Sequence, residues 1–348
     1  MLLASTDGPD AAAQLADSLL QRLRQRIRLN DHTVGVTVSI GVTMIPADSG
    51  EPGVLMRYAD LAMYRAKEAG RNNVQFFTPT LNARAAWRLL QYEELVSALD
   101  ADHLILHYQP KIELATGQVV GVAAFLRWQH PEKGLMSAQQ FIHLAEESGL
   151  VLRLVEIGLR QACIQIQALE RAGFETLSIA VSFSVRQVMA SGFVDRFRRV
   201  IAETGLSPQR LEVEVPGAIL AEEPRLLQEL LGALRDIGVR LILADFGVGD
   251  CSPSALQKLP FSAVKIDQRF IRDIPYDVSA TDVTAAVIAL ARKLRLTVVA
   301  EGVETTQQVS FLKSAGCTQC QGNLYSYPLS EEALIGFLVR QYERPLIP

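Results

Sequence analysis

The sequence has few cysteines and no long apolar run. Its four cysteines, Cys163, Cys251, Cys317 and Cys320, are too few and too scattered for a disulfide-rich fold. The single CxxC pair, at 317 and 320, cannot complete a four-ligand zinc site on its own. No apolar run reaches the roughly 18 residues that a membrane helix needs, and the first ten residues lack the features of a signal peptide. We therefore expect a cytoplasmic protein that does not span a membrane.

The sequence also lacks a positive charge excess. Its formal net charge is -4, which gives no electrostatic reason to bind duplex nucleic acid. Hydrophobic residues make up 49% of the chain and charged residues 21%, which is typical of a globular protein with ample core. A length of 348 residues predicts two or three domains, one of which can be a large α/β barrel.

The first 78 residues have their own pattern of elements. Apolar residues at helical spacing predict a helix over 11–29, and alternation predicts a strand over 33–45. A second amphipathic stripe runs from Leu55 to Ala66 and ends by Gly70, and a short strand is expected over 73–77. These elements predict a small α+β segment.

Two motifs in this segment resemble the C-terminal half of a GGDEF domain, a family that makes cyclic di-GMP from GTP. They are Val-Ser-Ile-Gly-Val at 38–42 and Ala-Asp-Leu-Ala-Met-Tyr-Arg-Ala-Lys at 59–67. The name-giving Gly-Gly-(Asp/Glu)-Glu-Phe turn and the half that precedes it are absent. We therefore expect no cyclase activity, and we interpret Lys67 and Arg71 as solvated surface groups. Residues 79–100 are predicted to form a linking helix.

From residue 101 to 348, short apolar runs alternate with amphipathic helical runs. Such alternation predicts a parallel sheet, and about eight units over this length predict a (β/α)8 TIM-type barrel. Side chains with catalytic or binding roles are expected where the strands end, at the carboxyl-end mouth. The expected strands are 104–108, 119–125, 177–183, 211–215, 241–244, 263–266, 297–300 and 322–325.

Several motifs in this region resemble the EAL family, whose active members cleave cyclic di-GMP. The family signature is Gly-x-Glu-Ala-Leu-x-Arg-Trp; here Gly121, Arg127 and Trp128 are in register, but the Glu is Ala123 and the Leu is Phe125. The resemblance implies a modified barrel with one antiparallel strand. Further matches in family order are Tyr-Gln-Pro at 108–110, Val-Lys-Ile-Asp at 264–267, Val-Ala-Glu-Gly-Val-Glu-Thr at 299–305, Gln-Gly at 321–322 and Ser-x-Pro-Leu at 326–329.

Most of the metal ligands that the resemblance implies are missing. Cleavage in the family uses two divalent cations, which need several oxygen ligands each. The four positions that hold the primary metal in the family are Ala123, Ser182, Glu214 and Ala244 here, so only Glu214 keeps the family ligand. The supporting loop at 247–252 also departs from the family pattern, and Gly217 replaces a glutamate. From these losses we expect no bound metal, no other cofactor and no enzymatic activity.

Other family positions retain polar residues. Lys265 with its neighbouring carboxylates is interpreted as an ion-pair cluster without a metal, and a residual one-metal site is the alternative. The resemblance implies that cyclic di-GMP is held partly by Gln109 and Arg127, with residues near Asp267, Gln321 and Pro328 forming the base-binding walls. The retained remnants of the catalytic site are Glu214, Asp245, Lys265, Glu301 and Glu304.

The sequence therefore predicts a degenerate EAL-like barrel behind a truncated GGDEF-like segment. Its expected role is that of a catalytically inactive cyclic di-GMP receptor or a protein-interaction module in bacterial second-messenger signalling. Two alternatives stay open: a weak metal-dependent phosphodiesterase, and a scaffold that binds no nucleotide. The expected partners are cyclic di-GMP and a signalling protein, and homodimer formation also stays open.

Overall fold

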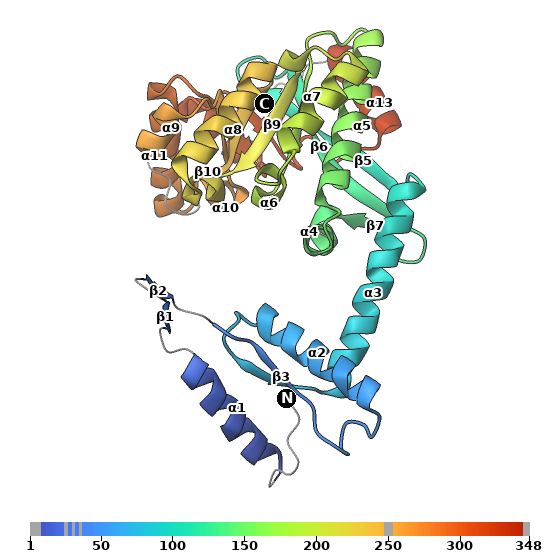
Figure 1. The fold of residues 1–348 in the computed structure, drawn as a ribbon. Helices are drawn as coiled ribbons and strands as arrows, with labels where there is room; N and C mark the ends of the chain where they lie inside the picture. The colour runs from blue at the N-terminus through green and yellow to red at the C-terminus, as the bar shows by residue number, and fades with distance from the viewer. Residues whose placement is uncertain (1–7, 24–26, 30–31, 35–36, 247–252, 344–348) are drawn as a thin grey trace. The chain divides into compact units, whose positions relative to one another are not determined.

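A computed structural model of the chain describes residues 8–23, 27–29, 32–34, 37–246 and 253–343. The chain divides into two compact units, Met1–Glu94 and Leu95–Pro348. Figure 1 shows the elements of both units. Among the described residues, no helix is both long and apolar enough to cross a membrane.

The first unit contains two small two-stranded sheets. The first pairs β1 with β2 in antiparallel orientation, and the second pairs β3 with β4 in parallel orientation. Gly41 lies where α2 crosses β3, because the backbone of α2 at Ala59 and Met63 occupies the place that a side chain would fill. The elements are α1 (Pro9–Leu23), β1 (Ile27–Leu29), β2 (His32–Val34), β3 (Ile40–Val42), α2 (Pro52–Glu68), β4 (Val74–Phe76) and α3 (Pro79–Asp100), the last of which runs into the second unit.

Two predictions for this unit are wrong in their bounds. The helix expected over 11–29 ends at Leu23, and Ile27–Leu29 is a strand, because it pairs with His32–Val34. The strand expected over 33–45 is represented by two short strands, β2 and β3, with residues 35–36 outside the described part. Alternation of valines predicted one long strand, but it could not show which partner each half pairs with.

The second unit contains a closed eight-stranded barrel. Strand order is β5-β13-β12-β11-β10-β9-β8-β6, and the β5–β6 pairing closes the ring, while β7 extends it at β6. β5 is antiparallel to both neighbours and the remaining barrel pairs are parallel, as the family resemblance implies. The strands are β5 (Leu104–Glu113), β6 (Val119–His130), β7 (Gly134–Ser137), β8 (Ser178–Ser182), β9 (Leu211–Pro216), β10 (Arg240–Phe246), β11 (Ala263–Ile266), β12 (Thr297–Glu301) and β13 (Gln319–Gln321).

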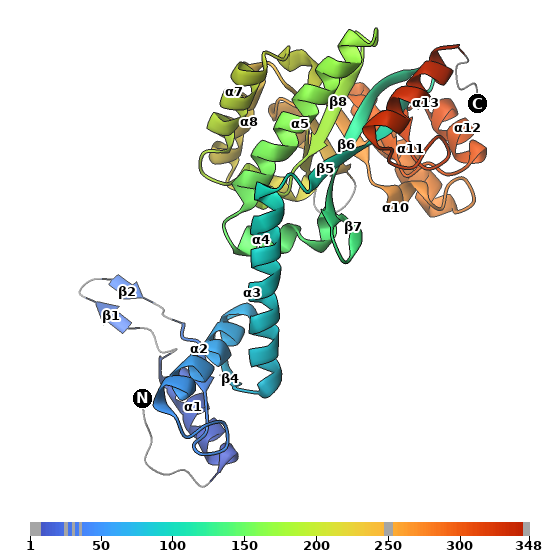
Figure 2. The ribbon, with the colours of Figure 1, turned by 90° about the vertical axis from the view of Figure 1, so that its right-hand side faces the viewer.

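Helices cover the outside of this barrel, as Figures 1 and 2 show. Their apolar residues recur every three or four positions, so that each helix turns one apolar stripe towards the strands. The α-helices are α4 (Ile142–Glu147), α5 (Val151–Arg171), α6 (Val185–Val188), α7 (Phe193–Thr204), α8 (Pro224–Ile237), α9 (Pro253–Lys258), α10 (Gln268–Ile271), α11 (Val278–Lys293), α12 (Thr306–Ala315) and α13 (Glu331–Glu343), and the short 3-10 turns are η1 (Ala138–Gln140), η2 (Pro208–Arg210) and η3 (Gly217–Ala221).

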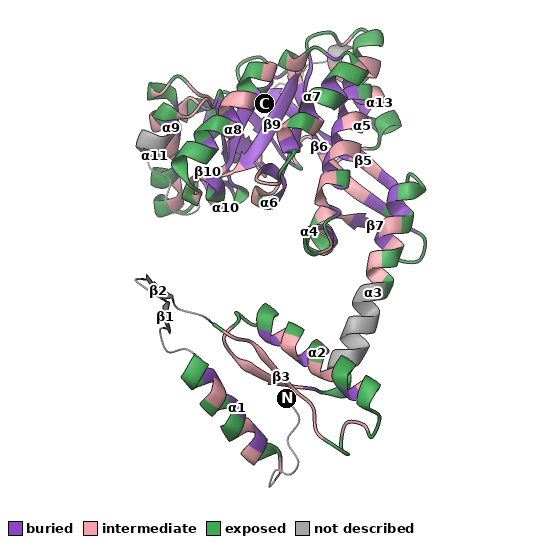
Figure 3. Cartoon of the chain, in the orientation of Figure 1, coloured by how far each residue is buried: buried purple, intermediate pink, exposed green. Residues whose placement is uncertain are grey.

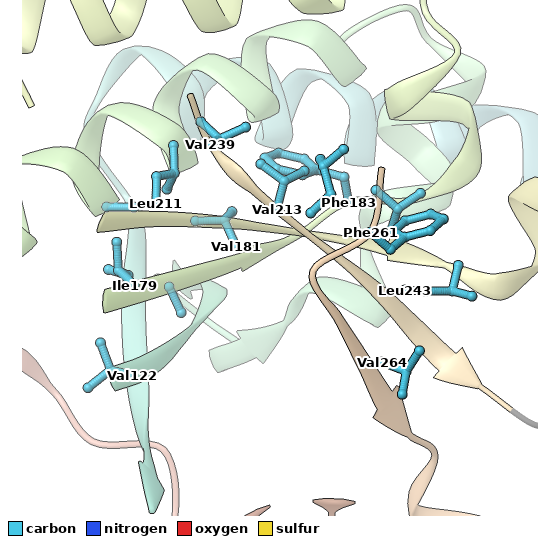
Figure 4. Close-up of a cluster of buried hydrophobic side chains, with 14 of the residues drawn as sticks. Val122, Ile179, Val181, Phe183, Leu211, Val213, Val239, Leu243, Phe261 and Val264 are labelled. Atoms are coloured by element: carbon cyan, nitrogen blue, oxygen red, sulfur yellow. The ribbon is translucent and has the colours of Figure 1, made fainter. Parts of the chain in front are cut away.

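The apolar layer between strands and helices forms one continuous core. In α5 the buried stripe includes Val155, Leu159, Ala162 and Ile166. Alternate residues of the strands point outward into the same layer, and Figure 4 shows ten of the core residues by name. Each fully buried leucine or valine contributes about 1.5–3 kcal/mol to folding. Figure 3 shows the buried strands beneath helices whose outer surfaces are exposed.

The expected strand at 322–325 is wrong. The eighth strand is β13, three residues earlier, and residues after Gln321 turn away from the sheet. Gly322 lies directly against the backbone of Val303, where a side chain would clash, and the backbone N–H of Leu324 donates to the Val303 carbonyl oxygen. The Gln-Gly motif therefore ends a strand instead of beginning one.

Candidate ligand-binding site

The barrel interior is lined by every second residue of its strands. In β6, Val122 and Ala124 belong to the outer core, so Gly121, Ala123, Phe125 and Arg127 share the opposite face. A side chain at Gly121 would meet Ser178 Oγ at 2.5 Å and Lys111 Cε at 3.0 Å, which places this face inside the barrel. Because the barrel strands other than β5 run in one direction, their carboxyl ends form one mouth.

A continuous chain of polar contacts crosses this mouth. Ser182 Oγ, at the end of β8, donates to Glu214 Oε2 of β9 at 2.5 Å. Lys265 Nζ of β11 donates to the same Glu214 oxygen at 3.0 Å and lies 3.2 Å from Glu301 Oε1 of β12. Gln321 Nε2 of β13 donates to Glu301 Oε1 at 3.3 Å. Five strands thus contribute one interacting side chain each, and we call these residues, Ser182, Glu214, Lys265, Glu301 and Gln321, the mouth set.

The ammonium group of Lys265 is the internal cation of this set. Its side chain is 3% exposed, and that of Glu214 is 2% exposed. Burial by itself would lower the pKa of Lys265, but the charges of Glu214 and Glu301 raise it above its usual value. The pKa of Glu301 is raised, mainly because burial penalises its charged form, although Lys265 acts in the opposite direction. Lys265 is therefore charged at neutral pH and partly neutralises its two carboxylate neighbours.

Asp245 adds a further carboxylate beside the mouth set. Its backbone has a φ of 52°, in the left-handed region that a non-glycine residue rarely adopts, and the pairing of β10 with β11 shifts register between Leu243 and Phe246. Its pKa is raised, first by burial and then by the nearby charge of Asp267. Asp267 itself accepts hydrogen bonds from Arg269 N at 2.7 Å and Arg269 Nε at 2.9 Å. The mouth therefore carries more carboxylates than the one lysine can neutralise.

The antiparallel strand β5 forms the other side of the mouth with β6. Gln109 is buried opposite Ala123, and its Nε2 donates to the Ser326 carbonyl oxygen at 2.9 Å and to Asn323 Oδ1 at 3.4 Å. These contacts hold the segment after β13 against β5. Pro328 lies in the same segment, and its carbonyl group near the His107 ring acts to raise the pKa of His107, although burial lowers that pKa overall.

Arg127 extends from β6 on the same face. Its guanidinium carbon lies 5.6 Å from the ring centroid of Phe125, and its Nη1 donates to the Leu126 carbonyl oxygen at 3.1 Å. Burial lowers the pKa of Arg127. Trp128, the next residue, points the other way and is buried edge-on against Phe141, with ring centroids 5.6 Å apart. Trp128 is thus a core residue, and Arg127 is the polar group that β6 presents.

Of the features singled out from the sequence, Glu304 lies apart from these contacts. Glu304 is exposed after β12, and its backbone N–H donates to Gln308 Oε1. Residues 247–252, the loop expected to support the site, lie outside the described residues. His107, Arg269 and Asn323 were not singled out as site residues from the sequence. Period-two spacing from Gln109 could have identified His107, because residues two apart on a strand share a face.

These residues do not fit the four-ligand metal site that the resemblance implies. Ala123 and Ala244 carry no donor atom, and the hydroxyl of Ser182 is directed to Glu214. The carboxylates of Glu214 and Glu301 both face the ammonium group of Lys265. Within the described part of the chain, no three His, Cys, Asp or Glu side chains are grouped so that they could hold a metal ion.

The cysteines of the described residues lie in the interior. Cys163, Cys317 and Cys320 are buried free thiols, and Cys251 lies outside the described residues. Burial raises the pKa of Cys163 to about 11 and that of Cys317 to about 12. These thiols are therefore protonated at neutral pH and poorly suited to bind a metal.

Comparison with known families assigns the fold. The EAL domain family matches residues 92–328, and the family described as diguanylate cyclase, GGDEF domain, matches residues 1–73. The chain belongs to the EAL family. The GGDEF match agrees with the resemblance of residues 38–42 and 59–67 to the C-terminal half of that domain.

Two curated relatives and one solved structure are similar to this EAL chain. It is 41% identical to cyclic di-GMP phosphodiesterase NbdA of Pseudomonas aeruginosa, over 93% of this chain and 41% of the relative. It is 38% identical to the bifunctional diguanylate cyclase/cyclic di-GMP phosphodiesterase MucR of the same organism, over 96% of this chain and 49% of the relative. The chain thus spans less than half the length of these two relatives. A structure described as the PaMucR phosphodiesterase in complex with c-di-GMP has 38% identity and a TM-score of 0.68, and covers 70% of this chain and 99% of its own.

These relatives correct one prediction made from the sequence. The expectation that the chain is not an enzyme is wrong, because relatives that are 41% and 38% identical to it are named as cyclic di-GMP phosphodiesterases. That expectation depended on counting family ligands at four positions. The count describes which side chains are present at those four positions. It does not measure the catalytic activity that the remaining carboxylates of the mouth can support.

Proposed function

We propose that this EAL barrel binds cyclic di-GMP at the carboxyl-end mouth. The observation that carries the proposal is the gathering of polar side chains there: the mouth set from five strands, with Gln109 and Arg127 on the two strands that close the ring. A ligand site at the carboxyl ends of barrel strands is the usual arrangement in this fold. The similar PaMucR structure, described as a c-di-GMP complex, supports the choice of ligand.

Arg127 is the proposed phosphate-binding group. Its guanidinium is half-buried on the face that lines the mouth, and its charge can form a forked, charge-assisted contact with phosphate oxygens. It lies on β6, whereas the carboxylates of the mouth set lie on β9 and β12. We expect a phosphate at Arg127 to be bound on β6, away from the strands that carry these carboxylates.

The proposed binding does not require a divalent cation. Lys265 already supplies a positive charge between Glu214 and Glu301, at 3.0 and 3.2 Å. We therefore expect Lys265 to reduce the repulsion between the carboxylates and the phosphates. Gln109, Gln321 and Pro328 are proposed to line the ligand, with Gln109 also anchoring the segment that follows β13. Asp267 is proposed to form part of the base-binding wall beside its partner Arg269.

Isothermal titration calorimetry with cyclic di-GMP tests this proposal. Arg127→Ala is expected to weaken binding by about 1.5–3 kcal/mol, the usual contribution of a charge-assisted hydrogen bond. Gln109→Ala is expected to weaken binding by about 0.5–1.5 kcal/mol, as a neutral hydrogen bond. The matched control is Arg198→Ala, which removes an exposed arginine from α7 and should leave the affinity unchanged. Equal loss in the Arg127 and Arg198 variants would contradict the assigned role of Arg127.

Hydrolysis of cyclic di-GMP is the second candidate function. It is favoured by the names of the two relatives and by the position of Glu214, Asp245 and Glu301 around one mouth. Chromatography of the nucleotide after incubation with Mn²⁺ tests it. Linear product that forms only with the chain and disappears with EDTA supports the enzyme, whereas binding without such product supports a receptor that passes the signal to a protein partner. If neither heat nor product is found, the nucleotide proposals fail and the scaffold alternative takes their place.

A further inference from the structure

Phe125 is an aromatic residue on the polar face of β6. It shares this face with Ala123 and Arg127, while its neighbours Ala124 and Leu126 contribute to the apolar layer on the other side. It lies directly opposite His107 of β5 and is only half-buried. A phenylalanine on the mouth face is therefore not explained by packing in the main core.

The ring of Phe125 contacts the charged group of Arg127. The guanidinium carbon of Arg127 lies 5.6 Å from the ring centroid, which is within the range of a cation–π interaction. The same guanidinium also donates from Nη1 to the Leu126 carbonyl oxygen at 3.1 Å. Neither of these two partners carries a negative charge. The guanidinium is thus held by an aromatic face and a carbonyl oxygen, and its charge is left for an anion.

We propose that Phe125 is a positioning residue that orders Arg127 for phosphate binding. This inference rests on the proposed function, in which Arg127 contacts the phosphate of cyclic di-GMP. An arginine side chain loses rotational freedom when it binds, and a side chain that is already ordered loses less. Phe125 therefore acts through Arg127 and does not need to touch the ligand.

A double-mutant cycle measured by calorimetry tests this role. The exposed cation–π contribution corresponds to about a two- to fivefold change in affinity, so Phe125→Leu should weaken cyclic di-GMP binding by about that factor. Phe125→Tyr keeps the aromatic face and should bind like the unsubstituted chain. In an Arg127→Ala background, Phe125→Leu should have no further effect, because the group that it orders is gone.

A control and a second measurement separate this role from general packing. Phe311→Leu on α12 makes the same replacement on an outer helix and should not change affinity. In the ligand-free chain, the NMR resonance of the Arg127 side-chain N–H should shift in Phe125→Leu and stay in place in Phe125→Tyr, since an aromatic ring shifts nearby nuclei.

The outcomes that overturn the inference differ from those that overturn the proposed function. An unsubstituted chain that binds cyclic di-GMP while Phe125→Leu binds equally well overturns the role of Phe125 alone. An equal loss from Phe125→Leu with and without Arg127 also overturns it, because that result means that the ring contacts the ligand directly. Absence of binding by the unsubstituted chain overturns the proposed function, and the positioning role fails with it.

Discussion

Two polar clusters of the barrel each contain a serine, a lysine and a buried glutamate, and they differ in charge balance. One is the mouth set, in which Ser182 and Lys265 both donate to Glu214. The other lies at the amino ends of the strands and consists of Ser178, Glu212, Lys111 and Arg240, which we call the amino-end set. The two glutamates are two residues apart on β9 and therefore share one face.

The difference between the two sets lies in what surrounds each glutamate. Glu212 is bonded to Lys111, accepts from Ser178 Oγ at 2.8 Å and lies 2.9 Å from Arg240. Although burial alone would raise the pKa of Glu212, the charges of Lys111 and Arg240 lower it. In the mouth set, Lys265 is the ion-pair partner of both Glu214 and Glu301, and Asp245 is nearby. The pKa values of Glu301 and Asp245 are raised.

This comparison separates a structural ion pair from a candidate ligand site. The amino-end set has enough positive charge for its carboxylate, and its pair Lys111–Glu212 is buried while Arg240 is exposed, so we interpret it as a structural ion pair. The mouth set has an excess of carboxylate and opens at the end of the barrel where ligands usually bind. Two glutamates on one strand, Glu212 and Glu214, can therefore have different roles. The balance of charges around each indicates whether it belongs to a structural ion pair or to a candidate ligand site.

The largest expected effect is on stability, and it distinguishes the two glutamates. Glu212→Gln leaves Lys111, which is 1% exposed, with an uncompensated charge, and should lower the free energy of unfolding by about 3–5 kcal/mol. Glu214→Gln should cost less, about 1–2 kcal/mol, because Lys265 keeps Glu301 as its partner. Urea unfolding of both variants measures the difference. Equal losses would mean that the charge balance does not distinguish the two sets.

A second prediction changes the mouth set by returning oxygen ligands to it. The combined variant Ala123→Glu, Ser182→Asn and Ala244→Asp should bind Mn²⁺ more tightly than the unsubstituted chain, because divalent cations need several oxygen ligands. Its metal-dependent cleavage of cyclic di-GMP should increase by about 10²-fold or more, since several kcal/mol of charge stabilisation is gained. Manganese titration and product chromatography measure the two effects.

The single variant Ala123→Glu is the control for this change. It still lacks oxygen ligands at 182 and 244 of the kind that the family uses, so it should gain little of either effect. If the single variant equals the combined one in metal affinity, the three positions do not act together.

The smallest expected effect concerns His107, which faces the mouth from β5. Burial, followed by the charge of Arg127, lowers its pKa, although the bond to the Pro328 carbonyl acts in the opposite direction. The ring is therefore neutral at pH 7.5 and gains its proton only below its usual pKa of about 6.5. That added positive charge beside Arg127 should tighten binding of the anionic nucleotide by about two- to fivefold as the pH falls through the lowered pKa of His107. His107→Gln should remove this increase in a calorimetric pH series, and an unchanged increase would assign it to another group.

Much of the barrel could be predicted from the sequence, because its strands are continuous apolar runs. Seven of the eight expected strands overlap observed ones, namely β5, β6 and β8 to β12. The eighth was misplaced at 322–325, because Gly322 was interpreted as part of an apolar run. In the structure, Gly322 packs against the backbone of Val303, directly after β13 ends. In the first unit, residues 27–29 continue the helical pattern of α1, and only their pairing with residues 32–34 makes them a strand.

The candidate site was predictable residue by residue but not as a network. Glu214 and Lys265 lie near the ends of the expected strands 211–215 and 263–266, and Glu301 follows the expected strand 297–300, which placed these three at the mouth, whereas Gln321 was assigned through the family resemblance. Their contacts depend on the register of neighbouring strands, such as Ser182 opposite Glu214, and one sequence does not contain that information. The amino-end set was missed for the same reason, because Lys111 and Glu212 are 101 residues apart in the chain. The binding roles proposed for the individual side chains stay predictions.

The most direct test of the central claim is a titration of the whole chain with cyclic di-GMP in the presence of EDTA. The mouth set has Lys265 as its internal cation, so one molecule should bind per barrel with the same affinity with and without chelator. Heat that appears only when Mg²⁺ or Mn²⁺ is added, or no heat at all, would contradict the proposed metal-independent site.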